Sequence, residues 1–462
     1  MAVEMKVGGA SAGETPDLAI AGAWVATVNA EDRVLSPGTV TVTGKRISGV
    51  YGPGEAVPLA RRIIDGGNKL VLPGFVNVHA HTVLSGLRGK TEDAPSEVSL
   101  HSHILPFRSR MTPEGAFALA RLGALESLRF GSTTIGDLYW QEGAIGHAFE
   151  EVGVRGVLGQ SISETNLLKV GAGDFTFDRR RGQETLRIAE EVIAKWHGRG
   201  DGRFRCVLAP HAPDDCSPEL LKDIQALARQ HRTVISMHVS QSRSEEQRIR
   251  AWHGKSTTRF LADLGLLGPE LVGAHCVFLS DEDVALYAES GAWFAYLPVI
   301  NAKRGYAAPA AKLAAAGANM SLGADNMTGD MVLAAQMATM VARITAKEST
   351  ILPPRQVLRM ATMGGAKALG LGQEIGSIEV GKRADLVIID LDRPHLWPVH
   401  DPVATYFHWG QAGDVETVIV DGEIVIRDGR STRVELRQVA AAAQAAAELG
   451  WGRLWGESGA AH

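Results

Sequence analysis

The chain has 462 residues, of which 45% are hydrophobic and 21% are charged, and its net charge is −5. This length and composition allow one large α/β domain and a smaller module. The acidic balance gives no sign of nucleic acid or an anionic membrane as partner, so we expect a small-molecule substrate. The three cysteines, Cys206, Cys216 and Cys276, are too few and too scattered for a disulfide framework or a cysteine zinc site, and they favour a reducing compartment.

The N-terminal stretch indicates no secretory signal. Residues 1–14 are rich in Gly, Ser and Ala and have no apolar core behind basic residues, so we expect a disordered lead-in. No apolar run is long enough to span a bilayer. We therefore expect a cytoplasmic protein with no membrane partner.

Short strands separated by turn residues occupy both ends of the sequence. The first set lies in residues 15–72 and the second in residues 375–432, where GSIEVGKRADLVIID and VETVIVDGEIVIRDG have the same character. We expect the two sets to pair into one β-sandwich. The Ala-rich residues 433–462 predict a terminal surface helix.

The middle of the chain, residues 73–374, alternates predicted strands and helices. Thr112-Pro113, Ser217-Pro218 and Ser280 each mark a helix start. Eight strand–helix units in series predict a (β/α)8 barrel. The predicted strands begin at Phe75 and then cover 132–140, 154–164, 204–212, 233–241, 271–277, 292–301 and 319–326.

The first of these strands carries two histidines at its carboxyl end. Phe75 to Val78 predicts a short buried strand, and His79 and His81 follow it. Alternate strand residues point the same way, so the two imidazoles lie on one side of the backbone. Such a pair suits a borderline divalent cation such as zinc.

Other strand ends add polar groups at the same barrel face. They are His211, His238, His275 and Asp325. Three histidines (His79, His81, His238) with Asp325 can hold one divalent ion and leave room for water, whose pKa the ion lowers toward about 7. Zinc or cobalt fits these ligands, and so does iron or manganese. Asp325 can then accept the water proton, and His275 can hydrogen-bond the water or polarise a carbonyl.

The order of the motifs resembles the amidohydrolase superfamily. PGFVNVHAH, the strand-5 histidine, GAHCV, GADN and VLRMATMGGAKALGL follow one another as in its cytosine deaminase and triazine hydrolase branch. The resemblance implies a metal-dependent hydrolase with a TIM barrel. It implies metal binding by His79, His81, His238 and Asp325, and a catalytic or supporting role for His275. Within the branch, the sequence is similar to the group of molinate and phenylurea hydrolases. We also expect a homo-oligomer.

Three departures from the branch shape the expected substrate. Gln241 stands where the deaminases have a glutamate, and an amide cannot shuttle a proton. Tyr296 begins an apolar Tyr-Leu-Pro-Val-Ile-Asn stretch in place of a polar strand-7 motif, which favours a neutral substrate. No lysine ends strand 4, so we expect one metal.

We therefore expect hydrolysis of the carbonyl C–N or C–S bond of a small neutral urea, thiocarbamate, carbamate or amide, as in herbicide and xenobiotic degradation. The alternative is an aminohydrolase or dehalogenase acting on an N-heteroaromatic ring. A non-catalytic metal-binding protein is a third reading, which metal-dependent turnover would exclude.

Four further residues join Gln241 as expected substrate-binding residues: His211, Trp140, Tyr296 and His103. His211 ends strand 4, where binding to substrate or water and a purely supporting role are equally compatible with its position. Trp140 follows strand 2 and is equally consistent with packing. His103 belongs to a second His-x-His, which we expect in a loop as part of the substrate wall because no strand aims it at the metal.

Overall fold

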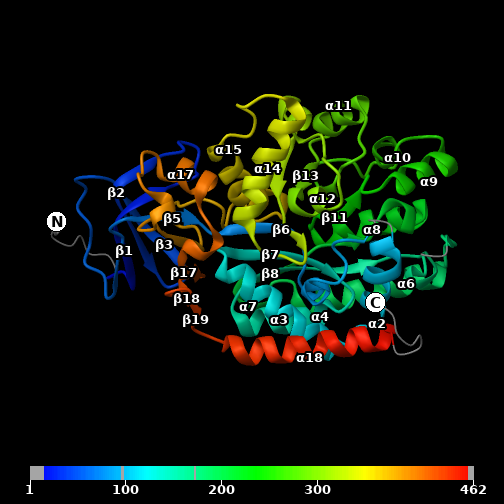
Figure 1. The fold of residues 1–462 in the computed structure, drawn as a ribbon, viewed down its shortest axis with the longest axis horizontal. Helices are drawn as coiled ribbons and strands as arrows, with labels where there is room; N and C mark the ends of the chain where they lie inside the picture. Colours follow the sequence, from blue (N-terminus) through cyan, green and yellow to red (C-terminus); the bar gives the residue numbers. More distant parts are fainter. Residues whose placement is uncertain (1–14, 95–97, 171–172, 456–462) are drawn as a thin grey trace.

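The computed structural model describes residues 15–94, 98–170 and 173–455 (Figure 1). The predicted disordered lead-in, residues 1–14, lies outside the described residues. Within the described residues, no helix combines the length and the apolar character needed to cross a bilayer.

Strands from both ends of the chain form one hydrogen-bonded sheet of nine strands. Its order is β19-β18-β17-β16-β5-β1-β2-β3, with β4 paired to β1. The strands from the two ends meet where β5 and β16 run antiparallel and Val71 faces Ile388. This end sheet lies to the left of the barrel in Figure 1. Its strands are β1 (Leu18–Ala26), β2 (Val34–Thr43), β3 (Arg46–Tyr51), β4 (Ile63–Asp65), β5 (Lys69–Pro73), β16 (Leu386–Asp390), β17 (Val415–Val420), β18 (Glu423–Arg427) and β19 (Arg430–Ser431). The predicted domain boundaries stay predictions.

The middle of the chain forms the predicted (β/α)8 barrel. Apolar side chains fill its strands, because each strand is covered on both faces. The strands are β6 (Phe75–His81), β7 (Ser132–Tyr139), β8 (Arg155–Ile162), β9 (Phe204–Cys206), β10 (Ala209–Pro210), β11 (Ile235–Val239), β12 (Leu271–His275), β13 (Trp293–Tyr296), β14 (Asn319–Leu322) and β15 (Asp325–Asn326).

Two divided strands close the barrel. In the fourth strand, β9 and β10 pair with β8, and Leu208 between them bridges to Ile235 of β11. In the eighth strand, β14 pairs with β13 and β15 pairs with β6. Gly323 lies at this second division, where a Cβ atom would come within 2.7 Å of Leu297 and 3.1 Å of the His79 carbonyl oxygen. A residue without a side chain therefore lets the eighth strand approach the first metal-site strand.

Helices follow the strands and cover the barrel. The predicted N-caps Thr112, Ser217 and Ser280 each accept a backbone N–H bond, and Gly291 ends the helix that Ser280 begins. The helical segments are η1 (Thr82–Leu87), η2 (Ser99–Ile104), α2 (Leu105–Arg110), α3 (Pro113–Arg129), α4 (Glu142–Val152), α5 (Leu167–Val170), α6 (Arg179–Trp196), α7 (Arg199–Gly202), η3 (Pro213–Asp215), α8 (Pro218–His231), α9 (Arg243–His253), α10 (Thr257–Asp263), α11 (Asp281–Ser290), α12 (Pro298–Lys303), α13 (Ala310–Ala315), α14 (Met331–Ala346), α15 (Pro354–Arg359), η4 (Met360–Gly364), α16 (Gly365–Ala368), η5 (Pro394–Leu396), α17 (Pro402–Trp409), η6 (Ala412–Asp414) and α18 (Leu436–Trp455).

Two local predictions were wrong. The strand predicted over 292–301 ends at Tyr296, because Pro298 occupies the first turn of α12 and its fixed φ favours a helix there. The loop predicted around His103 is the helical segment η2, which runs directly into α2.

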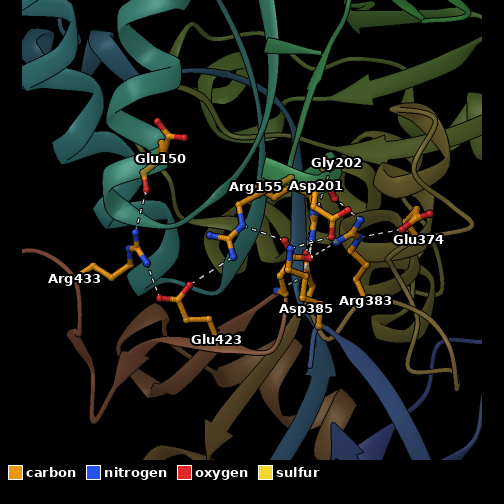
Figure 2. Close-up of polar contacts among 12 residues, drawn as sticks. Glu150, Arg155, Asp201, Gly202, Glu374, Arg383, Asp385, Glu423 and Arg433 are labelled. Carbon is orange, nitrogen blue, oxygen red and sulfur yellow. Dashed lines mark hydrogen bonds and ion pairs between the residues drawn. The ribbon is translucent and has the colours of Figure 1, made fainter. Parts of the chain in front are cut away.

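A buried ion network joins the barrel to the end sheet (Figure 2). Arg155 at the start of β8 is 1% exposed and donates from Nε and Nη2 to the two carboxylate oxygens of Asp385, at 2.9 and 3.0 Å. Arg155 and Arg383 also both donate to Asp421. Each buried charge of this network therefore has a partner of opposite sign, which offsets the cost of removing it from water.

The last helix, α18, returns to the barrel and packs along α3 (Figure 1). Trp451 is buried and donates from its indole nitrogen to the carbonyl oxygen of Gly86, at 2.9 Å. Its ring also lies 5.3 Å from that of Phe107 in α2. The helix thus supports the segment that follows the first barrel strand.

Candidate metal site and substrate pocket

The carboxyl ends of the barrel strands gather a buried cluster of histidines and one carboxylate. His79 and His81 lie on β6, His238 on β11, His275 at the end of β12 and Asp325 at the start of β15. Potential ligand atoms of His79, His81 and His238 lie within 4.8 Å of one another, and so do those of His79, His275 and Asp325. The two groups share His79, so the geometry is that of one centre.

Individual distances show how tightly the cluster is drawn together. Nε2 of His81 lies 3.4 Å from Nε2 of His238 and 3.5 Å from Oδ1 of Asp325. Nε2 of His79 lies 3.9 Å from the same carboxylate oxygen. Asp325 Oδ2 is 3.8 Å from Nε2 of His275.

Second contacts orient two of the imidazoles. Nδ1 of His81 lies 2.6 Å from the Leu138 carbonyl oxygen, and Nδ1 of His238 lies 2.6 Å from that of His211. Each Nδ1–H donates to its carbonyl, so each Nε2 carries a lone pair toward the cluster. This arrangement is typical of metal-ligating histidines, because the outer hydrogen bond fixes tautomer and ring direction.

The protonation of the cluster also suits a cation. Burial lowers the pKa of His79 to about 3, and it lowers the pKa of His81 and His238 well below the usual value. The rings are therefore neutral at pH 7 and able to coordinate. His79 is fully buried and neither of its ring nitrogens has a hydrogen-bond partner among the described residues. A bound cation removes that deficit, so the donor set fits a divalent metal ion.

The backbone is strained at two of these positions. His275 has φ 74° and Asp325 has φ 64°, both in the left-handed region that costs a side-chain-bearing residue roughly 1–3 kcal/mol. Such conformations persist where the surrounding fold enforces them. Here they coincide with the two residues expected to act on water.

Two buried acidic residues, Asp137 on β7 and Glu142 at the start of α4, lie near the cluster. Asp137 Oδ2 accepts hydrogen bonds from the Thr82 backbone nitrogen and hydroxyl. Burial raises the pKa of Asp137 to about 6, and burial followed by the charge of Asp137 raises the pKa of Glu142 well above its usual value. Asp137 therefore anchors the residue after His81.

The predicted substrate residues divide into two groups. His211 lies beside the cluster, with its ring 4.9 Å from that of His238, and its Nδ1 contacts the Asp215 carboxylate. Trp140 is next to it, at 5.8 Å between rings. The structure thus brings these two expected residues to the metal site, although their binding role stays a prediction.

The other three expected residues lie in different surroundings. Gln241 is half-buried, and its backbone nitrogen donates to Glu245 Oε2 at 2.9 Å. Tyr296 is fully buried against Phe294, and its hydroxyl has no partner among the described residues. His103 lies against Trp451 of α18, at 6.4 Å between rings, in a contact that the sequence did not indicate.

A cavity of about 430 Å³ lies between the segment after β6 and helix α12. Met327 lines it and also lines a small recess that contains His81 and Asp325. The cavity therefore adjoins the cluster. Its lining is mixed, because it includes Glu92, Asp93, Lys303 and Arg304 besides apolar residues. This wall is more polar than the Tyr296 stretch led us to expect.

One residue of the site was missed by sequence reasoning. Arg108 in α2 is 3% exposed, and its guanidinium carbon lies 4.0 Å from the Trp140 ring centre. Arginines are scattered along the sequence, so nothing singled this one out. The sequence did offer one signal for Arg108, which is its place in the long segment between the first strand and the helix that Thr112 caps.

A family model described as the amidohydrolase family matches residues 70–425. The chain belongs to the amidohydrolase family. The (β/α)8 barrel and the site for a divalent metal agree with that membership.

Two relatives within the family are similar over most of the chain. A 5-methylthioadenosine/S-adenosylhomocysteine deaminase from Thermoanaerobacter pseudethanolicus is 36% identical, covering 82% of this chain and 86% of that protein. A 5'-deoxyadenosine deaminase from Methanothermobacter thermautotrophicus is 35% identical, covering 89% of this chain and 94% of that protein.

Two solved structures have a similar fold. An adenosine deaminase from Xanthomonas campestris with bound zinc superposes with a TM-score of 0.87 at 27% identity, covering 96% of this chain and 99% of that one. The atrazine chlorohydrolase from Arthrobacter aurescens complexed with zinc has a TM-score of 0.85 at 24% identity, covering 93% and 100%. The second likeness concerns the fold alone.

The expectation of a hydrolase for ureas, thiocarbamates, carbamates or amides was wrong. The similar relatives are named deaminases of adenosine derivatives and not molinate or phenylurea hydrolases, so the expected xenobiotic role falls with it. The error came from Gln241. An amide removes one group that could transfer a proton, but it leaves the histidine and aspartate cluster that can hold a metal ion.

Proposed function

We propose that the chain is a metal-dependent aminohydrolase that replaces an amino group on an N-heteroaromatic ring with oxygen from water and releases ammonia. An adenine nucleoside is the first candidate substrate. The observation that carries the proposal is the extent of the likeness to deaminases, 36% identity over 82% of the chain, in a protein whose buried histidine cluster fits a divalent ion.

His79, His81, His238 and Asp325 would hold the metal, with zinc the first candidate because the similar adenosine deaminase structure contains it. A divalent ion supplies a water of lowered pKa, and so a nucleophile near neutral pH. The chain's own contribution is to keep three imidazoles neutral, to aim two of them through backbone carbonyls, and to exclude bulk water from the centre.

Two residues next to the metal would handle the water proton. Asp325 offers Oδ2, which has no hydrogen-bond donor among the described residues and faces His275 at 3.8 Å. Asp325 would accept the proton from water, and His275, whose Nδ1–H donates to Asn301 Oδ1, would accept a hydrogen bond at Nε2 from the oxygen that becomes the ring carbonyl. The backbone is strained at both residues, so the surrounding fold must hold it, and with it these atoms, in place.

A ring nitrogen must also be protonated before the amino group leaves. The Gln241 amide can donate a hydrogen bond to that nitrogen, but it cannot transfer a proton. His211 is the nearest alternative, because its ring lies beside His238 and its Nδ1 is held by Asp215. We assign the proton transfer to His211, with Gln241 orienting the ring.

The test is ammonia release by the zinc-loaded protein from adenosine, 5'-deoxyadenosine and 5-methylthioadenosine, with product formation followed by the change in ultraviolet absorbance. We expect turnover of at least one of them, and its loss in His79→Ala. His211→Asn should lower kcat by about 10²-fold or more, whereas an exposed histidine on α4, His147, should be replaceable by Ala without effect. Absence of ammonia release from all three would contradict the proposal.

A further inference from the structure

A buried guanidinium with two nitrogens that have no hydrogen-bond partner among the described residues lies beside the metal site. Nε and Nη2 of Arg108 are buried, and neither donates to any described residue. Other buried arginines of the chain differ, since Arg155 and Arg383 lie in the ion network with Asp385 and Asp421. Because an unpaired buried cation is costly, the position of Arg108 calls for a partner.

The surroundings place Arg108 at the substrate side of the centre. Its guanidinium carbon stands 4.0 Å from the ring centre of Trp140, and Trp140 in turn contacts His211. The ring of His211 lies 4.9 Å from that of the proposed ligand His238. The guanidinium therefore lies over an indole that is one residue away from the metal site.

The free edge of this guanidinium has a defined recognition chemistry. Nε–H and Nη2–H point the same way and form a fork that matches two coplanar acceptor atoms. The same chain shows the fork in use, because Arg155 donates from these two atoms to both oxygens of Asp385. In Arg108 neither atom of the fork has a partner among the described residues. The contact with the Trp140 ring holds the guanidinium in place, and an acceptor pair must lie in the guanidinium plane to use the fork.

We propose that Arg108 is a specificity-determining residue that binds, side-on, a coplanar pair of acceptor atoms on the heteroaromatic substrate. The pair is either a carboxylate on the ring or a ring carbonyl with its neighbouring ring nitrogen. This inference rests on the proposed function only for the ring. It narrows the preferred substrates within that class: an adenine base presents an amino group where the second acceptor would have to be, so an adenine nucleoside would bind without filling the Arg108 fork.

The experiment measures the binding of two matched probe pairs to the zinc-loaded protein by isothermal titration calorimetry. Orotate against uracil tests the carboxylate, and hypoxanthine against purine tests the carbonyl beside a ring nitrogen. We expect one member of one pair to bind about tenfold or more tightly than its match, the discrimination that a bidentate arginine contact gives. Preference for orotate identifies the carboxylate, and preference for hypoxanthine identifies the ring edge.

Variants connect the preference to the residue. Arg108→Met should abolish it, and Arg108→Lys should keep a reduced preference for orotate and none for hypoxanthine, because a lysine has charge but no fork. Arg199→Met is the matched control, since Arg199 also stacks on a tryptophan, Trp196 at 4.9 Å, but is exposed and remote from the cluster. Melting temperature and zinc content identify any variant that fails to fold, and Arg108→Lys then decides the question.

The inference is overturned if neither pair is discriminated by the wild type, or if the preference persists in the folded Arg108 variants. Its failure is separable from that of the proposed function. Adenosine turnover with no Arg108-dependent preference leaves the aminohydrolase standing and removes the acceptor-pair assignment. An Arg108-dependent preference without any ammonia release from the nucleosides keeps the assignment and removes the proposed reaction.

Discussion

The side-chain oxygen of Asn301 lies 3.0 Å from Nδ1 of His275. Nδ1–H donates to this oxygen, so Nε2 of His275 carries the lone pair and faces Asp325. Asn301 comes from α12, the helix that replaces the predicted end of the seventh strand. The apolar stretch from Tyr296 therefore ends in a residue that positions the imidazole next to the reacting water.

Replacing Asn301 by Leu should lower kcat by about 10–100-fold, because the tautomer and direction of His275 are no longer fixed. The affinity for zinc should change less than kcat does, since Asn301 contacts none of the proposed metal ligands. Steady-state kinetics and zinc titration measure the two effects. Asn319→Ala, on the exposed end of β14, serves as the control. Equal loss of zinc and of kcat would point to general damage of the centre.

Replacing His238 by Ala should reduce the zinc bound per chain from about one to nearly none, because it removes one of three imidazoles from a centre that needs all of them. Metal analysis by mass spectrometry after dialysis gives the ratio directly. His147→Ala should bind as much zinc as the wild type. Full retention of zinc in His238→Ala would exclude His238 as a ligand.

The Gln241→Glu variant should gain activity in ring deamination. A carboxyl group can carry a proton to the ring nitrogen, and general acid catalysis of this kind contributes about 10²–10⁴-fold. We expect kcat for adenosine to rise by at least tenfold, measured as ammonia release. Gln230→Glu on the exposed face of α8 controls for added charge. An unchanged kcat would mean that a second acid at position 241 does not speed the protonation of the ring nitrogen, which His211 then carries out alone.

Asp137 should make folding stability depend on pH in a way that its amide analogue does not. Burial raises its pKa from 3.8 to about 6, so between these values the folded protein binds more protons than the unfolded chain. Its contribution to the free energy of unfolding therefore falls as pH rises through that window, by about 3 kcal/mol.

Urea unfolding of zinc-free protein at pH 4 and pH 7 measures this effect. The wild type should lose about 2.4 kcal/mol relative to Asp137→Asn between the two pH values. The exposed Asp223→Asn on α8 should show no such difference from the wild type. A parallel pH dependence of wild type and Asp137→Asn would show that Asp137 titrates normally.

Replacing Arg155 by Met should destabilise the protein by about 4 kcal/mol, because it leaves the buried carboxylates of Asp385 and Asp421 short of a counter-charge. The free energy of unfolding from urea titration gives the value. Arg187, whose ion pairs with Glu184 and Glu191 are exposed, should tolerate the same replacement without measurable loss. Similar losses in both variants would contradict a special role for the network in Figure 2.

The barrel and the cluster could be predicted because strand ends carry local signals. His79 and His81 follow an apolar strand directly, and the other strands end in His238, His275 and Asp325, so the convergence of parallel strands brings these residues together. Where proline changed the local geometry, as at Pro298, the predicted strand continued too far.

Arg108 could not be predicted, because its importance depends on a contact with Trp140 that arises only when α2 folds over β7. The contacts of His103 and Trp451 also depend on a helix that returns from the far end of the chain. The substrate class was wrong for a different reason. One amide at position 241 was given more weight than the rest of the site, although a single proton donor can be supplied by another residue.

The hydrogen bond from Trp451 to Gly86 joins positions 365 residues apart. During synthesis on the ribosome, the segment that carries Arg108 is made early and its support is made long afterwards. A nascent chain therefore lacks the support that Trp451 gives to the segment after β6 until translation has passed that residue. Release of the polypeptide before that point would leave the segment around Gly86 without its contact to α18.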